Sequence, residues 1–321
     1  MHVIFLGAAA FAVPSLQNLI AHSYDVDAVF TQPDRPSGRG QKLQPGPIKV
    51  FAQSHGIPVF QPERIRNEEN RDLFEKFKPD FIVVAAYGQI LPGWLLKAAR
   101  LMPVNVHASL LPRYRGAAPI SWAILNGEAI AGVTTMVMEE KLDSGAMLLQ
   151  KEIPISLTMT AGELTDILSE AGAGLLIQTL DGVLKNAITP INQDESRVSW
   201  APRIAKEMAE VAWAKGALEI HNQIRAMNPW PGAHTMFRGE RLHLWRSLPM
   251  DSSAGSSKQP GAFLGLSKDG IYVQCGGCEI LDVLEVQKPG KNRISGREFA
   301  NGARLRAGDS LAQDFSKQQI T

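Results

Sequence analysis

Short apolar runs alternate with stretches of helical spacing through the first part of the chain. The apolar runs are four to six residues long and predict strands at residues 3–6, 26–31, 81–86, 104–107 and 134–138. The segments between and after them have apolar residues three and four apart and predict helices at residues 11–21, 48–55, 70–77, 93–99, 119–125 and 160–184. The last helix has a capping box, in which Thr160 is followed three residues later by Glu163. Strands that alternate with helices predict an α/β fold with a Rossmann-like, mostly parallel sheet.

A different pattern follows the long helix. Residues 189–206 are polar and have few periodic apolar positions, which is typical of a linker, and a helix is predicted at 214–227, where Asn228-Pro229 ends it. Turn residues then separate short apolar runs, which predict strands at 233–238, 241–247, 261–266, 270–274 and 279–287. Short strands at this spacing favour a small OB-like β-barrel. We therefore expect an α/β domain over residues 1–188, a linker over 189–206 and a barrel domain over 207–321, and a chain of 321 residues is long enough for two domains.

The charge of the chain is unevenly distributed. The 33 Lys and Arg residues nearly balance the 32 Asp and Glu residues, and this net charge of +1 argues against a nucleic-acid partner when it is averaged over the chain. Residues 1–200, however, hold 17 basic and 20 acidic side chains, whereas residues 201–321 hold 16 basic and 12 acidic ones. We therefore expect a basic face on the second domain, and a nucleic-acid partner stays open.

Composition favours a globular protein of the cytoplasm. Hydrophobic residues make up 45% of the chain and charged residues 20%, which is enough to bury a sizeable core. The chain has two cysteines, Cys275 and Cys278, and so few favour a reducing compartment. Their spacing would suit zinc, but Gly276-Gly277 between two predicted strands favours a two-residue hairpin turn, and we expect no metal. No apolar run approaches the roughly 18 residues of a membrane-spanning helix, so we expect no membrane partner.

A polar pair stands at the end of a predicted buried strand. Asn105 and His107 are two residues apart, so their side chains point to one face of the sheet, at the carboxyl end where open α/β sheets bind ligands. A neutral imidazole can carry a proton near pH 7, and an amide can donate a hydrogen bond to a developing oxyanion. The alternative is a buried histidine with no chemical role.

Asp143 is the third polar group of this set. It follows the next predicted strand, and a βαβ crossover would place the end of that strand beside His107. A carboxylate there could orient the imidazole or accept a proton itself, unless Asp143-Ser144-Gly145 is only a turn. Because no activated Ser, Cys or Lys stands beside the set, we expect direct transfer between bound substrates and no covalent enzyme intermediate.

Two further segments could bind phosphate. The turn Gly7-Ala8-Ala9-Ala10-Phe11 follows a strand but has only the first glycine of a dinucleotide fingerprint, which favours a simple tight turn. Residues 32–47 contain four prolines, three glycines and three basic residues before Lys49, more than a strand-to-helix turn needs. These basic residues could reach the phosphates of a nucleic acid, although a solvated loop with incidental charge stays open.

These motifs together resemble those of a known enzyme family. The segments Asn105-Val106-His107, Ser109-Leu110-Leu111-Pro112 and Leu142-Asp143-Ser144-Gly145 resemble the signature of folate-dependent formyltransferases. Further segments are similar to those of the members that act on charged initiator tRNA, and the similarity extends over about residues 1–310: Thr31-Gln32-Pro33-Asp34-Arg35-Pro36, Ala86-Tyr87-Gly88, Ile90-Leu91-Pro92 and Asn228-Pro229-Trp230-Pro231.

The resemblance implies a reaction and its residues. It implies transfer of the formyl group of 10-formyltetrahydrofolate to the α-amino group of methionine on initiator tRNA, with Asn105, His107 and Asp143 as catalytic residues. The implied folate-binding residues are Ser109, Leu110, Leu111, Pro112 and Ile90. The implied tRNA-binding residues are Arg35, Arg39 and Lys42, together with the basic face of the barrel. We expect a monomer, and which of His107 and Asp143 is the base stays open.

The rival interpretations are a formyltransferase for a sugar-nucleotide amine or a purine precursor, a 10-formyltetrahydrofolate hydrolase, and an RNA-binding module without catalysis. The basic loop and the second domain argue against the other enzymes, and the complete Asn105, His107 and Asp143 set argues against the binding module.

Overall fold

The computed structural model describes residues 1–37, 42–250 and 258–312. The chain forms two compact units. The first unit comprises Met1–Pro119, Ile130–Pro154 and Thr165–Pro202, and the second comprises Ile120–Ala129, Ile155–Leu164 and Arg203–Thr321.

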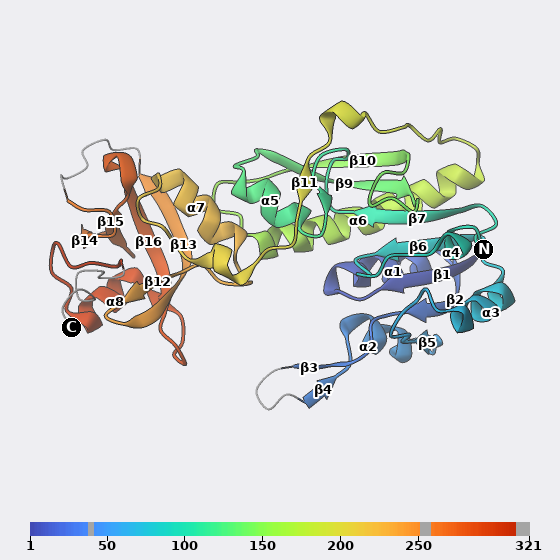
Figure 1. Cartoon of the computed structure of the whole chain (residues 1–321), viewed down its shortest axis with the longest axis horizontal. Helices are drawn as coiled ribbons and strands as arrows, with labels where there is room; N and C mark the ends of the chain where they lie inside the picture. Colours follow the sequence, from blue (N-terminus) through green and yellow to red (C-terminus); the bar gives the residue numbers. More distant parts are fainter. Residues whose placement is uncertain (38–41, 251–257, 313–321) are drawn as a thin grey trace. The chain divides into compact units, whose positions relative to one another are not determined.

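The first unit is built on a seven-stranded sheet with the order β10-β9-β7-β6-β1-β2-β5 (Figure 1). The strands are β1 (His2–Gly7), β2 (Asp25–Phe30), β5 (Val59–Phe60), β6 (Phe81–Ala85), β7 (Met102–His107), β9 (Ile130–Val137) and β10 (Met147–Pro154). Neighbouring strands from β5 to β7 are parallel, whereas β9 and β10 are antiparallel to their neighbours. The predicted α/β fold with a mostly parallel sheet is confirmed.

The expected parallel crossover from β7 to the next strand is wrong. Val104 pairs with Val137 and His107 pairs with Thr134, so β9 runs antiparallel to β7 and its carboxyl end lies beside the start of β7. The apolar pattern located this strand correctly, but an apolar run has the same appearance in either direction.

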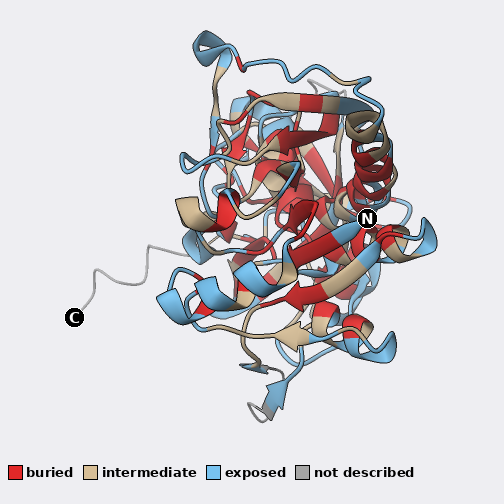
Figure 2. Ribbon diagram, turned by 90° about the vertical axis from the view of Figure 1, so that its right-hand side faces the viewer, coloured by how far each residue is buried: buried red, intermediate tan, exposed pale blue. Residues whose placement is uncertain are grey.

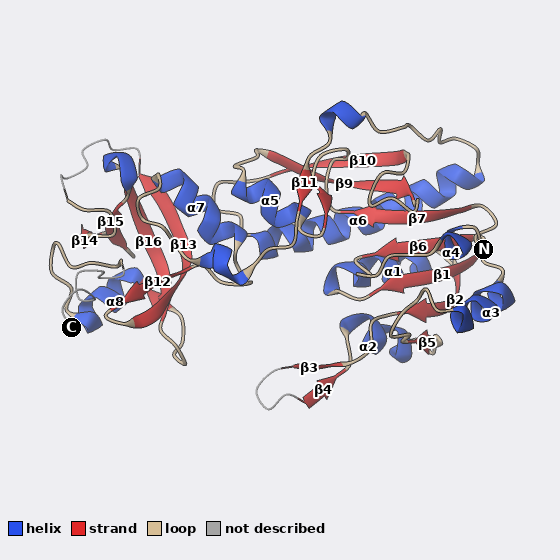
Figure 3. Ribbon diagram, in the orientation of Figure 1, coloured by secondary structure: helices blue, strands red, loops and turns tan. Residues whose placement is uncertain are grey.

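The helices lie at or near their predicted positions (Figure 3). They are η1 (Ala10–Ala12), α1 (Val13–Ala21), α2 (Pro47–Ser54), α3 (Glu68–Phe77), α4 (Gly93–Leu96), α5 (Pro119–Leu125) and α6 (Ala161–Leu184), with a short 3₁₀ turn η2 (Glu195–Arg197). The first unit also has two small strand pairs: β3 (Arg35–Ser37) with β4 (Lys42–Gln44), and β8 (Arg115–Gly116) with β11 (Trp200–Ala201). At the first turn, a Cβ on Gly7 would lie 2.7 Å from Phe5 and 2.9 Å from Ala12, so this glycine serves close packing of the strand and the following helix.

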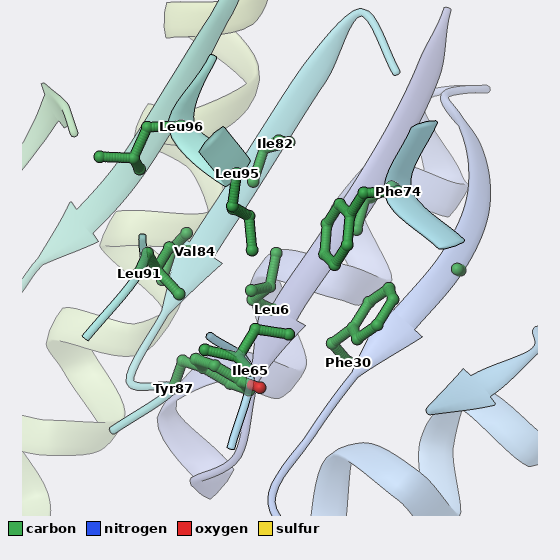
Figure 4. Close-up of a cluster of buried hydrophobic side chains, with 12 residues drawn as sticks. Leu6, Phe30, Ile65, Phe74, Ile82, Val84, Tyr87, Leu91, Leu95 and Leu96 are labelled. Carbon is green, nitrogen blue, oxygen red and sulfur yellow. The ribbon is translucent and has the colours of Figure 1, made fainter. Parts of the chain in front are cut away.

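The central strands of the first unit are buried (Figure 2). On one face, Leu6, Phe30 and Val84 belong to an apolar cluster that α3 and α4 cover (Figure 4). Phe30 of this cluster stacks on Phe74 with ring centroids 4.4 Å apart. Tyr87 is only 2% exposed in the same cluster, and its hydroxyl has no hydrogen-bond partner within the described part of the chain.

The other face of the sheet packs against α6. A Cβ on Gly172 would lie 2.8 Å from Val106, and the hydroxyls of Thr179 and Thr135 are 2.7 Å apart. By length and composition α6 could cross a membrane, which corrects the expectation that no segment reaches that length. More than half of its apolar window is nevertheless buried inside the protein, and the contacts with the sheet account for its composition.

The second unit contains a curled antiparallel sheet. Its strands are β12 (His234–Phe237), β13 (Glu240–Met250), β14 (Phe263–Leu266), β15 (Ile271–Gln274), β16 (Ile280–Gln287) and β17 (Ile294–Ser295), in the order β12-β13-β16-β15-β14 with β17 beside β16. Besides most of α5 and the first turn of α6, its helical segments are η3 (Lys206–Ala209), α7 (Ala217–Ala226), η4 (Gly276–Cys278) and α8 (Gly296–Ala303). Register shifts between Leu244 and Ser247 interrupt the β13–β16 ladder, and such bulges bend a sheet. The predicted small barrel is confirmed as a half-barrel.

The two cysteines lie in the connection between β15 and β16. These strands form the expected hairpin. Gln274 pairs with Ile280, however, so the connection has five residues, which include the turn η4, where a two-residue turn was predicted. Cys275 is buried and Cys278 is exposed. Within residues 1–37, 42–250 and 258–312, no three His, Cys, Asp or Glu side chains are grouped as metal ligands would be.

Candidate active site

Asn105 and His107 lie together at the carboxyl end of β7. Asn105 is paired with Val84, which belongs to the apolar cluster under α3 and α4, so both polar side chains point to that side of the sheet. They are 9% and 6% exposed. Two polar side chains are therefore held, almost buried, at the end of a central strand of the sheet.

The imidazole of His107 has a fixed orientation. Its Nε2 lies 3.1 Å from the backbone oxygen of Tyr114, and because a carbonyl only accepts hydrogen bonds, Nε2 must donate. The neutral ring therefore carries its proton on Nε2, which leaves Nδ1 as the free acceptor. Nδ1 faces the carboxylate of Asp143, with 3.8 Å between Nδ1 and Oδ2.

Asp143 reaches His107 by a different route from the one predicted. Since β9 runs away from His107, the loop between β9 and β10 has to return to bring the carboxylate back. Asp143 has a left-handed backbone with φ +50°, which is uncommon for a residue other than glycine. Its Oδ2 accepts a hydrogen bond of 2.8 Å from the backbone N–H of Gly116. The structure thus brings His107 and Asp143 together as expected, through a loop that no periodicity describes.

The amide of Asn105 makes no hydrogen bond to another residue in the described part of the chain, although the residue is 91% buried. An amide with free donors next to an oriented histidine is suited to stabilising negative charge on a substrate oxygen.

The loop that carries the predicted folate-binding residues is held by its own contacts. The Ser109 hydroxyl donates to the backbone oxygen of Arg113 at 2.6 Å, and the Leu111 N–H donates to the Thr134 hydroxyl at 3.1 Å. The side chains of Ser109, Leu111 and Pro112 are buried and that of Leu110 is half-buried. Ile90, in contrast, is 81% exposed on the loop after β6, the neighbour of β7.

Two of the predicted tRNA-binding residues, Arg35 and Lys42, begin the paired strands β3 and β4, apart from the catalytic set in sequence. Arg35 is exposed and lies 3.5 Å from Glu63, Lys42 begins β4, and Arg39 lies outside the described residues. Just before β3, a hydrogen bond from Lys49 lowers the pKa of the Asp34 carboxyl, and a hydrogen bond from Gln61 adds a smaller effect in the same direction. The hairpin is thus tied to the first unit at Asp34.

Backbone groups of two further residues complete the site. These are the Tyr114 carbonyl, which orients His107, and the Gly116 N–H, which binds Asp143. Both residues follow Pro112 within four positions, and both have a positive φ, +61° at Tyr114 and +123° at Gly116. The glycine was visible in the sequence, but a backbone contact leaves no pattern of side chains from which its partner could be predicted.

Comparisons with known proteins agree over both units. The family model described as formyl transferase matches residues 1–180, and the model described as formyl transferase, C-terminal domain, matches residues 203–304. Proteins named methionyl-tRNA formyltransferase are similar over almost the whole chain. That of Clostridium perfringens is 44% identical over 97% of this chain and 100% of its own, and that of Trichlorobacter lovleyi is 47% identical over 96% of each.

Solved structures share the fold at low sequence identity. An N-formyltransferase from Helicobacter canadensis, solved with folinic acid and dTDP-3-aminofucose, has a TM-score of 0.65 at 19% identity over 89% of this chain and 98% of that chain. HypX from Aquifex aeolicus, solved with tetrahydrofolic acid, has a TM-score of 0.62 at 16% identity over 93% of this chain and 46% of that chain. These two similarities concern the fold alone.

Proposed function

Because this chain belongs to the methionyl-tRNA formyltransferase family, it is a formyltransferase, and we propose that Asn105, His107 and Asp143 carry its reaction. The reaction transfers the formyl group of 10-formyltetrahydrofolate to the α-amino group of methionine on initiator tRNA. The observation that supports the residue assignment is the juxtaposition of the His107 Nδ1 with the Asp143 carboxylate, 3.8 Å apart at the end of β7.

The proton acceptor in this proposal is Nδ1 of His107. The amine nitrogen bonds to the formyl carbon, the bond from that carbon to the folate nitrogen breaks, and one proton has to move from the attacking nitrogen to the leaving one. Nδ1 takes this proton and returns it, because Nε2 is occupied by the Tyr114 carbonyl. The Asp143 carboxylate then stabilises the imidazolium, as the aspartate beside the histidine does in a Ser-His-Asp triad.

Asn105 acts on the oxygen of the formyl group in this proposal. That oxygen becomes negatively charged when the amine adds, and a preorganised amide donor lowers the energy of the charged state. The unpartnered amide of the largely buried Asn105 supports this role, because its donors need no rearrangement before they bind the oxygen.

We further propose how the substrates are held. The loop of Ser109, Leu110, Leu111 and Pro112, with Ile90, binds the folate, and the hairpin residues Arg35, Arg39 and Lys42 bind tRNA phosphates. Residues 1–188 are the catalytic domain, 189–206 the linker and 207–321 the tRNA-binding domain, in a cytoplasmic monomer. The basic excess of residues 201–321 supports the tRNA assignment.

A transfer assay tests the reaction. Purified protein is incubated with 10-formyltetrahydrofolate and methionyl-initiator tRNA, and formylated product is measured against free methionine, uncharged tRNA and an amino sugar nucleotide as alternative acceptors. We expect formylation of the charged tRNA. Absence of transfer to charged initiator tRNA with active folate, or faster transfer to the amino sugar, would contradict the function.

Two variants test the residues. His107→Ala should abolish turnover while tRNA binding persists, and unchanged turnover would remove His107 from the mechanism. Arg39→Ala should weaken tRNA binding and reduce its salt dependence while folate binding is retained. Weaker folate binding with unchanged tRNA binding would reassign the hairpin.

A further inference from the structure

Residues 191–201, which the sequence indicates only as a polar linker, run across the loops that hold His107 and Asp143. We call them the active-site strap. The strap begins with a two-way backbone bridge between Ile191 and Met147, with N···O distances of 2.8 and 2.9 Å. It ends at β11, which pairs with β8, and the Ser199 carbonyl accepts a 2.9 Å hydrogen bond from the Arg115 N–H. All of these residues belong to the first unit.

Both the nitrogen and the oxygen of the Gln193 side-chain amide form hydrogen bonds. Its Nε2 donates to the backbone oxygens of Asp143 and Gly145, each at 2.8 Å. Its Oε1 accepts from Arg115, at 3.0 Å from Nε and 2.8 Å from Nη2. Because a guanidinium only donates and a carbonyl only accepts, the amide fits in one orientation only. Gln193 is 9% exposed, so water is no ready substitute for these four bonds.

Arg115 is the fixed point behind Gln193. It is completely buried, and its guanidinium binds Glu195 of the strap as well, with Nη2 2.8 Å from Oε1 and Nη1 3.4 Å from Oε2. Glu195 also lies 3.8 Å from Lys141, which is on the same loop as Asp143. A buried guanidinium with a two-pronged carboxylate partner is geometrically rigid, so Gln193 is held in place from behind.

The strap reaches the partners of both catalytic side chains. The backbone of Asp143, with its unfavourable φ of +50°, is held at its oxygen by Gln193, while Gly116 holds its carboxylate. The Ser199 hydroxyl accepts a 2.9 Å hydrogen bond from the N–H of Tyr114, the residue whose carbonyl orients His107. A left-handed backbone at a non-glycine residue persists only when its surroundings over-determine it, and the strap supplies part of that restraint.

We propose that Gln193, oriented by Arg115, is a positioning residue that holds Asp143 against His107, so that the strap is part of the active site. This inference rests on the proposed roles of Asp143 and His107. It predicts that loss of the Gln193 hydrogen bonds lowers the rate of transfer and leaves the binding of both substrates almost unchanged.

Two full-length variants test the proposal. Gln193→Glu has nearly the same shape but would turn acceptor oxygens toward the carbonyls of Asp143 and Gly145, and Gln193→Met fills the space without hydrogen bonds. Gln223→Glu is the matched control, because Gln223 also donates from one amide to two backbone oxygens, those of Met208 and Glu210, in the second unit.

Steady-state transfer and amide hydrogen exchange are measured for each protein. In both Gln193 variants we expect kcat to fall about 100-fold, the effect of a misplacement of about 1 Å. The KM values for folate and tRNA should stay within about threefold, because binding contacts are retained. The Gly116 amide, which is bonded to Asp143, should exchange at least about tenfold faster, because opening of the loop exposes it. Gln223→Glu should leave kcat, the KM for folate and the exchange of the Gly116 amide unchanged.

The outcomes separate the two proposals. If the unaltered protein formylates no charged tRNA, the function fails, and the exchange of the Gly116 amide still reports whether Gln193 holds the loop. If either folded Gln193 variant keeps its kcat within about threefold of the unaltered protein, or loses rate with unchanged Gly116 exchange, the positioning role is overturned. Should Gln193→Glu fail to fold, Gln193→Met alone decides by the same criteria.

Discussion

Replacing Gly116 with alanine tests whether close contact between β8 and β11 supports the active site. Gly116 has a φ of +123°, a region that glycine alone enters easily. A Cβ at this position would lie 2.7 Å from the backbone oxygen of Ala201 and 3.2 Å from its carbonyl carbon. Backbone cannot rotate out of the way as a flexible side chain would, so either β11 or residue 116 has to move.

The cost follows from these contacts. Forcing a non-glycine residue into such a conformation costs about 1–3 kcal/mol. Displacing the Ala201 carbonyl also weakens its 3.1 Å hydrogen bond from the Ala118 N–H, a loss of about 0.5–1.5 kcal/mol. We therefore expect Gly116→Ala to lower the free energy of unfolding by about 2–4 kcal/mol. Because the Gly116 N–H binds the Asp143 carboxylate, kcat should fall by about 100-fold as well.

Urea unfolding followed by circular dichroism and the transfer assay measure the two effects. Gly174→Ala is the control in the same unit, because a Cβ there has no atom within 4 Å and the residue lies inside α6. In a helix interior alanine is more stable than glycine by about 0.5–1 kcal/mol, so this variant should unfold at slightly higher urea concentration with unchanged kcat. A Gly116→Ala protein with the unfolding midpoint and kcat of the unaltered chain would refute the reasoning.

Three further predictions concern residues outside the catalytic set. Tyr87→Phe should leave the free energy of unfolding unchanged or raise it by up to about 2 kcal/mol, because the buried hydroxyl has no partner among the described residues; a loss above about 1 kcal/mol in urea unfolding would contradict this. Hydrogen bonds, of which that from the Thr160 N–H has the largest effect, lower the pKa of the Glu163 carboxyl from 4.5 to about 2. The ionised carboxylate therefore stabilises the folded protein fully above pH 4.5, and this contribution is lost as the pH falls toward 2. The gap in unfolding midpoint between the unaltered chain and Glu163→Gln should therefore close over that range, and a constant gap would exclude this ionisation as its source. Burial raises the pKa of the Cys275 thiol to about 12, so iodoacetamide at neutral pH should add one group, at the exposed Cys278, and two equal adducts by mass spectrometry would argue against the buried thiol.

The sequence was informative wherever a buried element is apolar along its whole length or at helical spacing. β1 and β6 are buried along almost their whole length, and their apolar runs located them to within a residue or two. β10 was missed because it lies at the edge of the sheet, where Gln150, Lys151 and Glu152 interrupt the apolar pattern. α8 was missed because Gly296 and Gly302 weaken its helical pattern.

The candidate site could be predicted as a set of residues but only partly as an arrangement. Strand-end position was enough to select Asn105 and His107, since the side-chain period of a strand places both on one face. The approach of Asp143 depends on the direction of β9 and on a returning loop, and neither leaves a periodic trace. The role of Gln193 depends on a contact across 50 residues, which a polar stretch in a single sequence cannot indicate.

The strap also determines when the catalytic site can assemble during protein synthesis. Asp143 is synthesised 50 residues before Gln193, and Tyr114 is synthesised 85 residues before Ser199, whose hydroxyl accepts its N–H hydrogen bond. At about 5–20 residues per second, the loops that carry the catalytic groups have emerged several seconds before the segment that fastens them. A nascent chain that ends at residue 188 contains every catalytic side chain but lacks the hydrogen bonds that Gln193 and Ser199 make with the loops beside them.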